Sequence, residues 1–156
     1  MLENPRVQII RGLPGSGKTT LAKQRFSHLM RIETDMFFSR CGRYVFTKEL
    51  NRKAVKWFNK TVRECCAAGM DFVVTGVFSA HTERLWTTVK TALDAGYEVY
   101  IKTLNADYGN IHNVPHEHLD AMRAAFVSDR QLRREYAGNN HVHFGLMPLR
   151  ISEKKQ

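Results

Sequence analysis

A glycine-rich run near the amino terminus has the residue types and spacing that bind phosphate. Residues 12–19 read Gly-Leu-Pro-Gly-Ser-Gly-Lys-Thr, which matches the Walker A pattern G-x-x-x-x-G-K-[ST]. Glycines let backbone N–H groups approach a phosphate closely, and the N-terminus of a following helix adds a positive dipole end. The run therefore predicts a loop that binds a nucleoside triphosphate, and ATP is the nucleotide we expect.

Individual side chains of this loop have expected roles. Lys18 should reach the β- and γ-phosphates, and the Thr19 hydroxyl should ligate Mg²⁺. ATP and Mg²⁺ are therefore the expected cofactors. The residues expected to contact ATP are Gly12, Pro14, Gly15, Ser16, Gly17, Lys18, Thr19 and Thr20.

A carboxylate is expected at the same edge of the sheet. Asp35 follows the second expected strand, where it could accept a proton from an attacking hydroxyl or hold Mg²⁺ through water; a capping or surface aspartate is the alternative. The next strand, 72–74, runs into Gly76 rather than a second acid, and Asp71 lies at its opposite end. Thr19 and Asp35 are then the visible metal candidates, which argues against an ordinary ATPase or GTPase.

Hydrophobic periodicity predicts strands that alternate with helices. Five strands are expected within residues 6–11, 30–33, 72–74, 97–104 and 141–151. Helices are expected from the phosphate loop to about residue 29, from the N-cap Thr47 to Gly69, around 85–92 before Gly96, and from Pro115 to Phe126. This alternation predicts an α/β P-loop NTPase fold, with a parallel sheet covered by helices on both faces.

Length and composition indicate one globular domain. We expect it over residues 1–151 of the 156-residue chain, followed by a loose C-terminal tail at 152–156. No apolar stretch approaches the ~20 residues of a membrane span, so no membrane contact is expected. The absence of a signal peptide and the three cysteines, too few and too irregular for a disulfide framework, favour a cytoplasmic location.

The charge balance indicates the kind of partner. The chain has 24 Lys and Arg against 15 Asp and Glu, for a formal net charge of +9. A field of this sign attracts polyanions, and nucleic acid is the expected partner. The alternative is a basic protein whose only anionic ligand is ATP. The oligomeric state is left open.

Four stretches of the chain together resemble phage-type polynucleotide 5′-kinases and their relatives, which include the kinase-like domains of Nedd4-binding proteins and DNA hydroxymethyluracil kinases. The matching stretches are residues 9–22, 33–38, 95–99 and 114–122, in order and at similar spacing. The resemblance implies an adenylate-kinase-like sheet. It also implies that Asp35 is the general base for the acceptor hydroxyl and that Lys18 stabilises charge on the transferring phosphoryl group.

Three departures from that family stand out. Gly76 occupies the position of an acidic residue that ends the third strand, and Phe38 replaces an arginine three residues after the aspartate. The lid, 105–113, is short and contains no arginine. Either the acceptor differs from a simple 5′-hydroxyl, or the chain is a slow or inactive kinase. Candidates to replace the lid arginines are Arg123, Arg130, Arg133 and Arg134.

Other side chains are weaker candidates. The acceptor-side candidates are Arg40, Arg43, Tyr44, Arg123 and Arg130. Trp57 and Trp86 are expected in or near the core. His141 and His143 should share a strand face, but no adjoining cysteine or carboxylate is expected to complete a metal site.

The leading hypothesis is a kinase that transfers the γ-phosphoryl group of ATP to a hydroxyl of a nucleic acid. That hydroxyl is either the 5′-hydroxyl of DNA or RNA or a hydroxyl on a hydroxymethylated DNA base. One alternative is a nucleoside or nucleotide kinase. The other is an ATP-binding interaction protein that has lost most of its catalysis.

Overall fold

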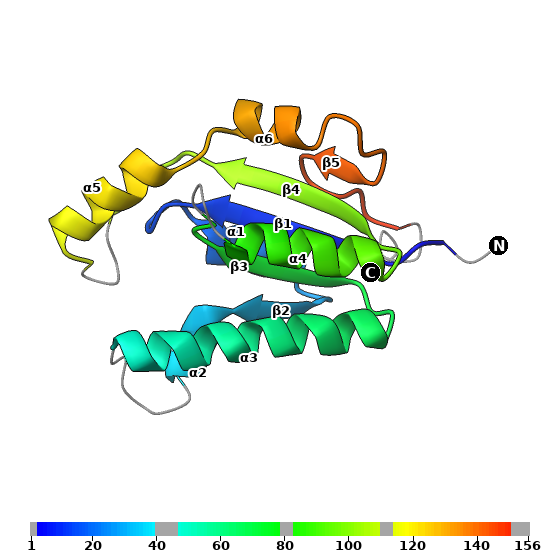
Figure 1. Ribbon diagram of the computed structural model, residues 1–156, viewed down its shortest axis with the longest axis horizontal. Helices are drawn as coiled ribbons and strands as arrows, with labels where there is room; N and C mark the ends of the chain where they lie inside the picture. Colours follow the sequence, from blue (N-terminus) through cyan, green and yellow to red (C-terminus); the bar gives the residue numbers. More distant parts are fainter. Residues whose placement is uncertain (1–2, 40–46, 79–82, 110–113, 151–156) are drawn as a thin grey trace.

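Five parallel strands form the sheet that carries the phosphate loop. The computed structural model describes residues 3–39, 47–78, 83–109 and 114–150. The strands are β1 (Arg6–Gly12), β2 (Met30–Glu33), β3 (Phe72–Gly76), β4 (Glu98–Leu104) and β5 (Val142–Phe144). They lie in the order β2-β3-β1-β4-β5, and every neighbouring pair is parallel (Figure 1). The predicted α/β class is confirmed.

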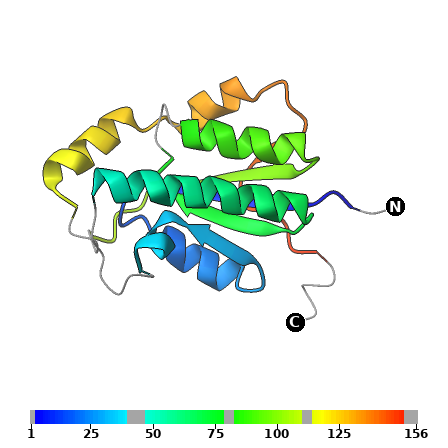
Figure 2. The ribbon, with the colours of Figure 1, turned by 60° about the horizontal axis from the view of Figure 1, so that its bottom comes forward.

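Helices cover both faces of this sheet. They are α1 (Lys18–Arg25), α2 (Thr34–Ser39), α3 (Lys48–Ala67), α4 (Glu83–Asp94), α5 (His116–Ala125) and α6 (Asp129–Glu135). The long helices α3 and α4 run side by side over one face (Figure 2). Within the described ranges, no helix combines the length and the apolar character needed to cross a bilayer.

The two faces of β1 explain the two-sided core. Side chains alternate along a strand, so odd and even residues of β1 point to opposite faces. Val7 and Ile9 pack in the core cluster formed with α3 and α4, whereas Ile10 packs with Ala22 of α1 and with Phe26, the residue that follows α1. Both faces of the central strand are therefore buried, which is typical of a parallel sheet.

Element boundaries agree with local signals in most places. The Thr47 hydroxyl caps α3 by accepting a hydrogen bond from the Leu50 N–H at 3.1 Å, and Gly69 follows this helix with φ +65°. α1 ends at Arg25, four residues before the predicted residue 29, because Phe26 leaves the helical conformation with φ −126° and is buried.

The last strand is shorter than the predicted segment 141–151. β5 ends at Phe144, and Gly145 follows with φ +130°, a conformation that favours glycine. Beyond it, the Met147 N–H donates to Oε1 of the fully buried Gln8, at 2.6 Å. The side chain of Gln8 thus takes the place of a neighbouring strand as the hydrogen-bond partner of the Met147 backbone.

The prediction that both tryptophans are core residues is wrong for one of them. Trp57 is partly buried and packs against the core, but Trp86 is 59% exposed. In α4, Leu85 and Val89 face the sheet, and Trp86 points about 100° away from Leu85 around the helix axis.

Candidate functional site

The Walker A run forms a left-handed turn between β1 and α1. Gly15 and Gly17 have φ of +83° and +90°, and Gly17 caps α1 without any side-chain hydrogen bond. The Ser16 hydroxyl is buried and has no hydrogen-bond partner within the described part of the chain. Backbone N–H groups at the start of α1 are therefore left for a ligand, and the turn suits the phosphates of ATP.

Lys18 lies folded back over this loop. Its Nζ donates to the carbonyl oxygens of Gly12 at 2.8 Å and Leu13 at 3.0 Å. Burial lowers the pKa of Lys18 to about 8, against the opposing effect of the Asp35 and Glu33 charges. The ammonium group is thus charged at neutral pH, next to the turn that would receive phosphate.

This pKa predicts how ATP affinity depends on pH. Binding a phosphate requires the charged ammonium group, so affinity should fall as the pH rises through 8, where free Lys18 begins to lose its proton. The expected loss is up to about tenfold per pH unit above that value. Titration calorimetry with ATP and Mg²⁺ between pH 7 and 9.5 measures it. The same pH slope in Lys18→Ala would contradict the assignment.

A second acidic residue lies next to the phosphate loop. Glu33 is 7% exposed at the end of β2, and its Oε2 accepts a hydrogen bond from the Thr19 hydroxyl at 3.3 Å. Its Oε1 lies 3.0 Å from Nε of Arg31. A hydroxyl and a carboxylate are hard oxygen donors, so the Thr19–Glu33 pair has the donor chemistry that would hold Mg²⁺.

Glu33 was not among the metal-ligand candidates from the sequence, because a second acid was expected at the end of the strand 72–74. The signal that could have found it is its place as the last residue of the preceding strand, two residues before Asp35. In the observed sheet, β2 pairs with β3 and aligns Glu33 with Thr75. A carboxylate of β2 thereby reaches the Thr19 hydroxyl.

Asp35 lies in the first turn of α2, which begins at Thr34 directly after β2. Its negative charge opposes the effect of burial on the pKa of both Lys18 and Arg84. The three charged side chains are therefore electrostatic neighbours at the carboxyl edge of the sheet. Such an arrangement can hold a proton acceptor beside bound phosphate.

The end of β3 explains why the strand-three acid is absent. A Cβ on Gly76 would lie 2.9 Å from a ring atom of Phe78, closer than real contacts allow. Phe78 itself has φ +44°, is 2% exposed and packs edge-on against Phe58, with the ring centroids 6.0 Å apart. An aromatic side chain therefore fills the space that a side chain at position 76 would need.

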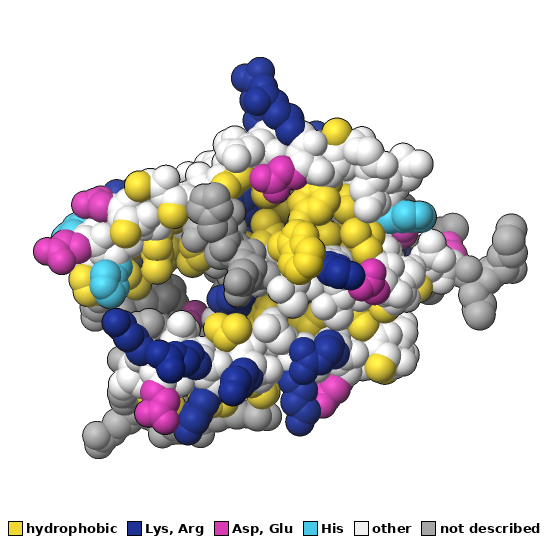
Figure 3. Space-filling model, viewed as in Figure 1, with side chains coloured by type: hydrophobic (Ala, Val, Ile, Leu, Met, Phe, Trp, Pro, Cys, Tyr) yellow, Lys and Arg dark blue, Asp and Glu magenta, His cyan; other side chains and the backbone are white. Residues whose placement is uncertain are grey.

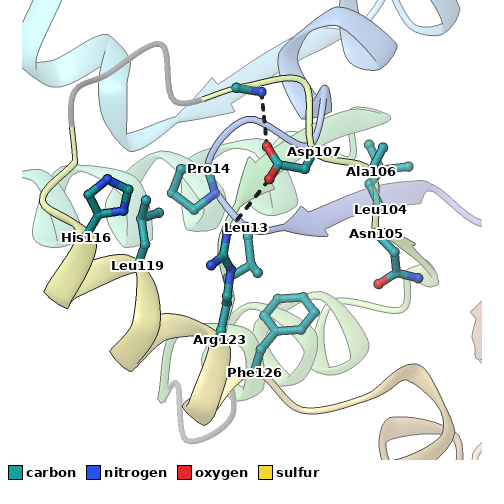
Figure 4. A pocket seen from close by; sticks show the side chains of 11 residues that line it. Leu13, Pro14, Leu104, Asn105, Ala106, Asp107, His116, Leu119, Arg123 and Phe126 are labelled. Carbon is teal, nitrogen blue, oxygen red and sulfur yellow. Dashed lines mark hydrogen bonds and ion pairs between the residues drawn. The ribbon is translucent and has the colours of Figure 1, made fainter.

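A pocket of about 360 Å³ lies on the other side of the phosphate loop, toward β4 (Figure 4). Its lining comes from the loop, the segment after β4 and α5: Leu13, Pro14, Leu104, Asn105, Ala106, Asp107, Gly109, His116, Leu119, Arg123 and Phe126. The Tyr108 N–H donates to the Gly15 carbonyl at 2.7 Å, so the lid segment rests on the phosphate loop. The sequence did not predict this pocket.

The two acceptor-side candidates that the structure describes, Arg123 and Arg130, lie on different helices. Arg123 lines the pocket and pairs with Asp107 at 3.7 Å, on the β4 side of the loop rather than the β2 side that carries Asp35. Arg130 is exposed on α6. Arg40, Arg43 and Tyr44 lie outside the described residues. The roles of all five remain predictions.

A carboxylate that the sequence did not point to lies next to His141 and His143. Glu98 on β4 contacts Nδ1 of His141 at 2.6 Å and Nε2 of His143 at 3.4 Å, because β4 and β5 are neighbours. Even so, no group of three or more His, Cys, Asp or Glu side chains in the described ranges is arranged to hold a metal ion.

Comparison with known proteins places the fold among P-loop kinases. The AAA domain family AAA_33 matches residues 7–134. A gluconokinase from Sinorhizobium meliloti 1021 superposes with a TM-score of 0.55 at 12% identity, over 97% of this chain and 88% of its own. A candidate kinase from Chloroflexus aurantiacus J-10-fl gives 0.54 at 18% identity, over 67% of this chain. A chain of the Pnkp1/Rnl/Hen1 complex gives 0.57 at 19% identity, over 78% of this chain.

These likenesses show the fold alone. The chain spans 61% of the length of the Chloroflexus protein and 40% of the matched chain of the Pnkp1/Rnl/Hen1 complex. The shared part is the P-loop core, which hosts many acceptor specificities.

Proposed function

Because this chain belongs to the AAA_33 family of P-loop kinase-like AAA domains, we propose that it transfers the γ-phosphoryl group of ATP to a hydroxyl of a nucleic acid. The acceptor is the 5′-hydroxyl of DNA or RNA, or a hydroxyl on a hydroxymethylated base. The observation that carries the proposal is the meeting of Lys18, Thr19, Glu33 and Asp35 at one edge of the sheet. These residues supply a phosphate-binding cation, two hard oxygen donors and a proton acceptor.

Each residue has one role in the proposed reaction. Lys18 exchanges its two backbone carbonyl partners for phosphate oxygens. Thr19 and Glu33 would hold Mg²⁺, which would supply positive charge to offset that of the phosphates. Asp35 takes the proton of the acceptor hydroxyl as its oxygen bonds to the γ-phosphorus, and the bond from that phosphorus to the β,γ-bridging oxygen breaks to release ADP.

A basic row on α3 supports a nucleic-acid acceptor. Arg52, Lys56 and Arg63 are exposed, and their spacing of four and seven residues places them on one helix face. No ion pair involves them among the described residues, whereas Lys53 and Lys60 pair with Glu49 and Glu64. Figure 3 shows Lys and Arg side chains in a row over α3. Such a row suits a phosphate backbone.

Transfer of labelled γ-phosphate to a panel of acceptors tests the proposal. The panel contains 5′-hydroxyl DNA, 5′-hydroxyl RNA, hydroxymethyluracil DNA and a nucleoside mixture, with Lys18→Ala as the blank. We expect label on a nucleic acid, lost in the blank. Label on nucleosides alone would show a small-acceptor kinase, and ATP binding without any label would show a binding protein.

The basic row gives the same assay a second readout. Replacing Arg52, Lys56 and Arg63 together with Gln should raise the KM for the oligonucleotide about ten- to a hundredfold at low salt. The KM for ATP should not change. Exposed Lys23 and Arg25 in the last turn of α1 provide the matched control, Lys23→Gln with Arg25→Gln. Equal KM values in the two variants would exclude the row as an acceptor surface.

A further inference from the structure

Arg84, in the first turn of α4, is an unusual residue that the sequence did not single out. It is partly buried, and its Nε and Nη2 atoms are shielded from solvent without a hydrogen-bond partner. A guanidinium group removed from water is unfavourable unless an anion or a hydrogen-bond acceptor compensates it. The described residues provide no hydrogen-bond acceptor for these two nitrogens, and the anion that acts on the group is the carboxylate of Asp35.

Two aromatic rings pack against the guanidinium group of Arg84. Its central carbon lies 4.8 Å from the ring centroid of Phe58 and 5.3 Å from that of Phe78. The ring of Phe78 fits here because Gly76 has no side chain, since a Cβ on residue 76 would clash with that ring. The absence of an acid at the end of β3 and the position of Arg84 are therefore parts of one arrangement.

This cation lies on the acceptor side of the site. The charge of Asp35 acts on Arg84 as it does on Lys18. Arg84 packs on Phe58 of α3, the helix that also carries the exposed row of Arg52, Lys56 and Arg63. The pocket next to α5 lies beyond β1 on the other side. An anion held by Arg84 would thus belong to the molecule whose hydroxyl faces Asp35.

We propose that Arg84 binds a phosphate oxygen of the acceptor, namely the phosphodiester that follows the reacting hydroxyl. The inference rests on the proposed function and deepens it, because it makes a negative charge next to the hydroxyl a requirement for good acceptors. An acidic residue at the end of β3 would repel such a phosphate. Here Gly76 leaves room for the ring of Phe78, and Arg84, which packs on that ring, attracts the phosphate. A guanidinium fork can also donate two parallel hydrogen bonds to a phosphate, which orients the acceptor.

Two oligonucleotides that differ by one charge test the proposal. Both have a 5′-hydroxyl and the same sequence, but the first linkage is a phosphodiester in one and an uncharged methylphosphonate in the other. KM and kcat are measured by transfer of labelled γ-phosphate, and binding is measured separately by fluorescence anisotropy. The proteins are the wild type, Arg84→Gln and the control Arg25→Gln, an exposed arginine at the end of α1.

The wild type and Arg25→Gln should prefer the phosphodiester by about ten- to a hundredfold in KM and in binding. Arg84→Gln should bind both oligonucleotides as weakly as the wild type binds the methylphosphonate. Its melting temperature should change little, because the substitution removes a shielded charge whose Nε and Nη2 have no acceptor among the described residues, and this gain offsets the lost packing on the two rings.

Three results would overturn the proposal. The first is a preference for the phosphodiester that survives in Arg84→Gln. The second is an equal loss of kcat on both oligonucleotides, which would place Arg84 at the transferring phosphoryl group. The third is a lower melting temperature with the preference unchanged, which would assign Arg84 to packing alone.

Failure of the proposed function can be told apart from failure of this inference. If the wild type transfers no phosphate to either oligonucleotide or to any nucleic acid of the acceptor panel, the proposed function fails, and anisotropy alone decides the role of Arg84. A preference seen in the wild type and lost in Arg84→Gln supports the inference. No preference in the wild type overturns it.

Discussion

Asp35→Asn is expected to lower kcat for phosphoryl transfer by about 10²- to 10⁴-fold, the usual contribution of a general base. The amide has nearly the same shape but cannot take the proton of the acceptor hydroxyl. Asp35 is also one of two negative charges that act on Lys18. Removing it should therefore leave the affinity for ATP unchanged or slightly higher.

Steady-state transfer to the best acceptor of the panel gives kcat, and calorimetry gives the ATP affinity. Asp94→Asn is the matched control, because Asp94 is an exposed aspartate at the end of α4 that pairs with Lys90. Its kcat should stay within about twofold of the wild type. Wild-type kcat in Asp35→Asn would remove Asp35 as the base, and loss of ATP binding would assign it to the nucleotide instead.

Arg11→Met is expected to lower the free energy of unfolding by about 3 to 5 kcal/mol, the range for breaking a buried charged network. Arg11 is fully buried on β1. Its Nη2 donates to the carbonyl oxygens of Phe78 at 3.1 Å and Val127 at 2.7 Å, and its Nη1 donates to the Thr103 hydroxyl at 3.2 Å. Burial lowers its pKa to about 10, and the charge of Asp129 opposes this effect.

The loss would be large because methionine fills similar space but leaves these acceptors without their donor. Arg11 connects β1 with the segment after β3 and with the link between α5 and α6. Urea unfolding followed by circular dichroism measures the change. Arg134→Met replaces an exposed arginine and should stay within about 0.5 kcal/mol. A similar small change in Arg11→Met would show that this network contributes little net stability.

Features that depend on local order along the chain could be predicted. The alternation of apolar runs gave the α/β class and, within a few residues, the first four strands. Thr47 and Gly69 marked the ends of α3 because caps act within one turn of the chain. The Walker A turn was also visible, because its glycines and Lys18 are close in sequence.

Features that depend on which elements lie side by side could not be predicted. The strand order placed Glu33 within reach of Thr19, and the packing of α4 over α3 set Arg84 on two aromatic rings. Trp86 was misplaced because the expectation rested on its large apolar ring, whereas its position in α4 lies off the face formed by the buried Leu85 and Val89.

The sequence by itself determined that this chain forms a phosphate loop between a buried strand and a helix, followed by an aspartate at the next strand end. Only the tertiary structure decided what surrounds that loop: a glutamate that accepts a hydrogen bond from Thr19, and a partly buried arginine whose Nε and Nη2 have no acceptor among the described residues. The physical reason is the distance along the sequence over which each kind of interaction acts. Backbone conformation and capping depend on neighbours in sequence, whereas burial and charge pairing depend on residues that only folding brings together.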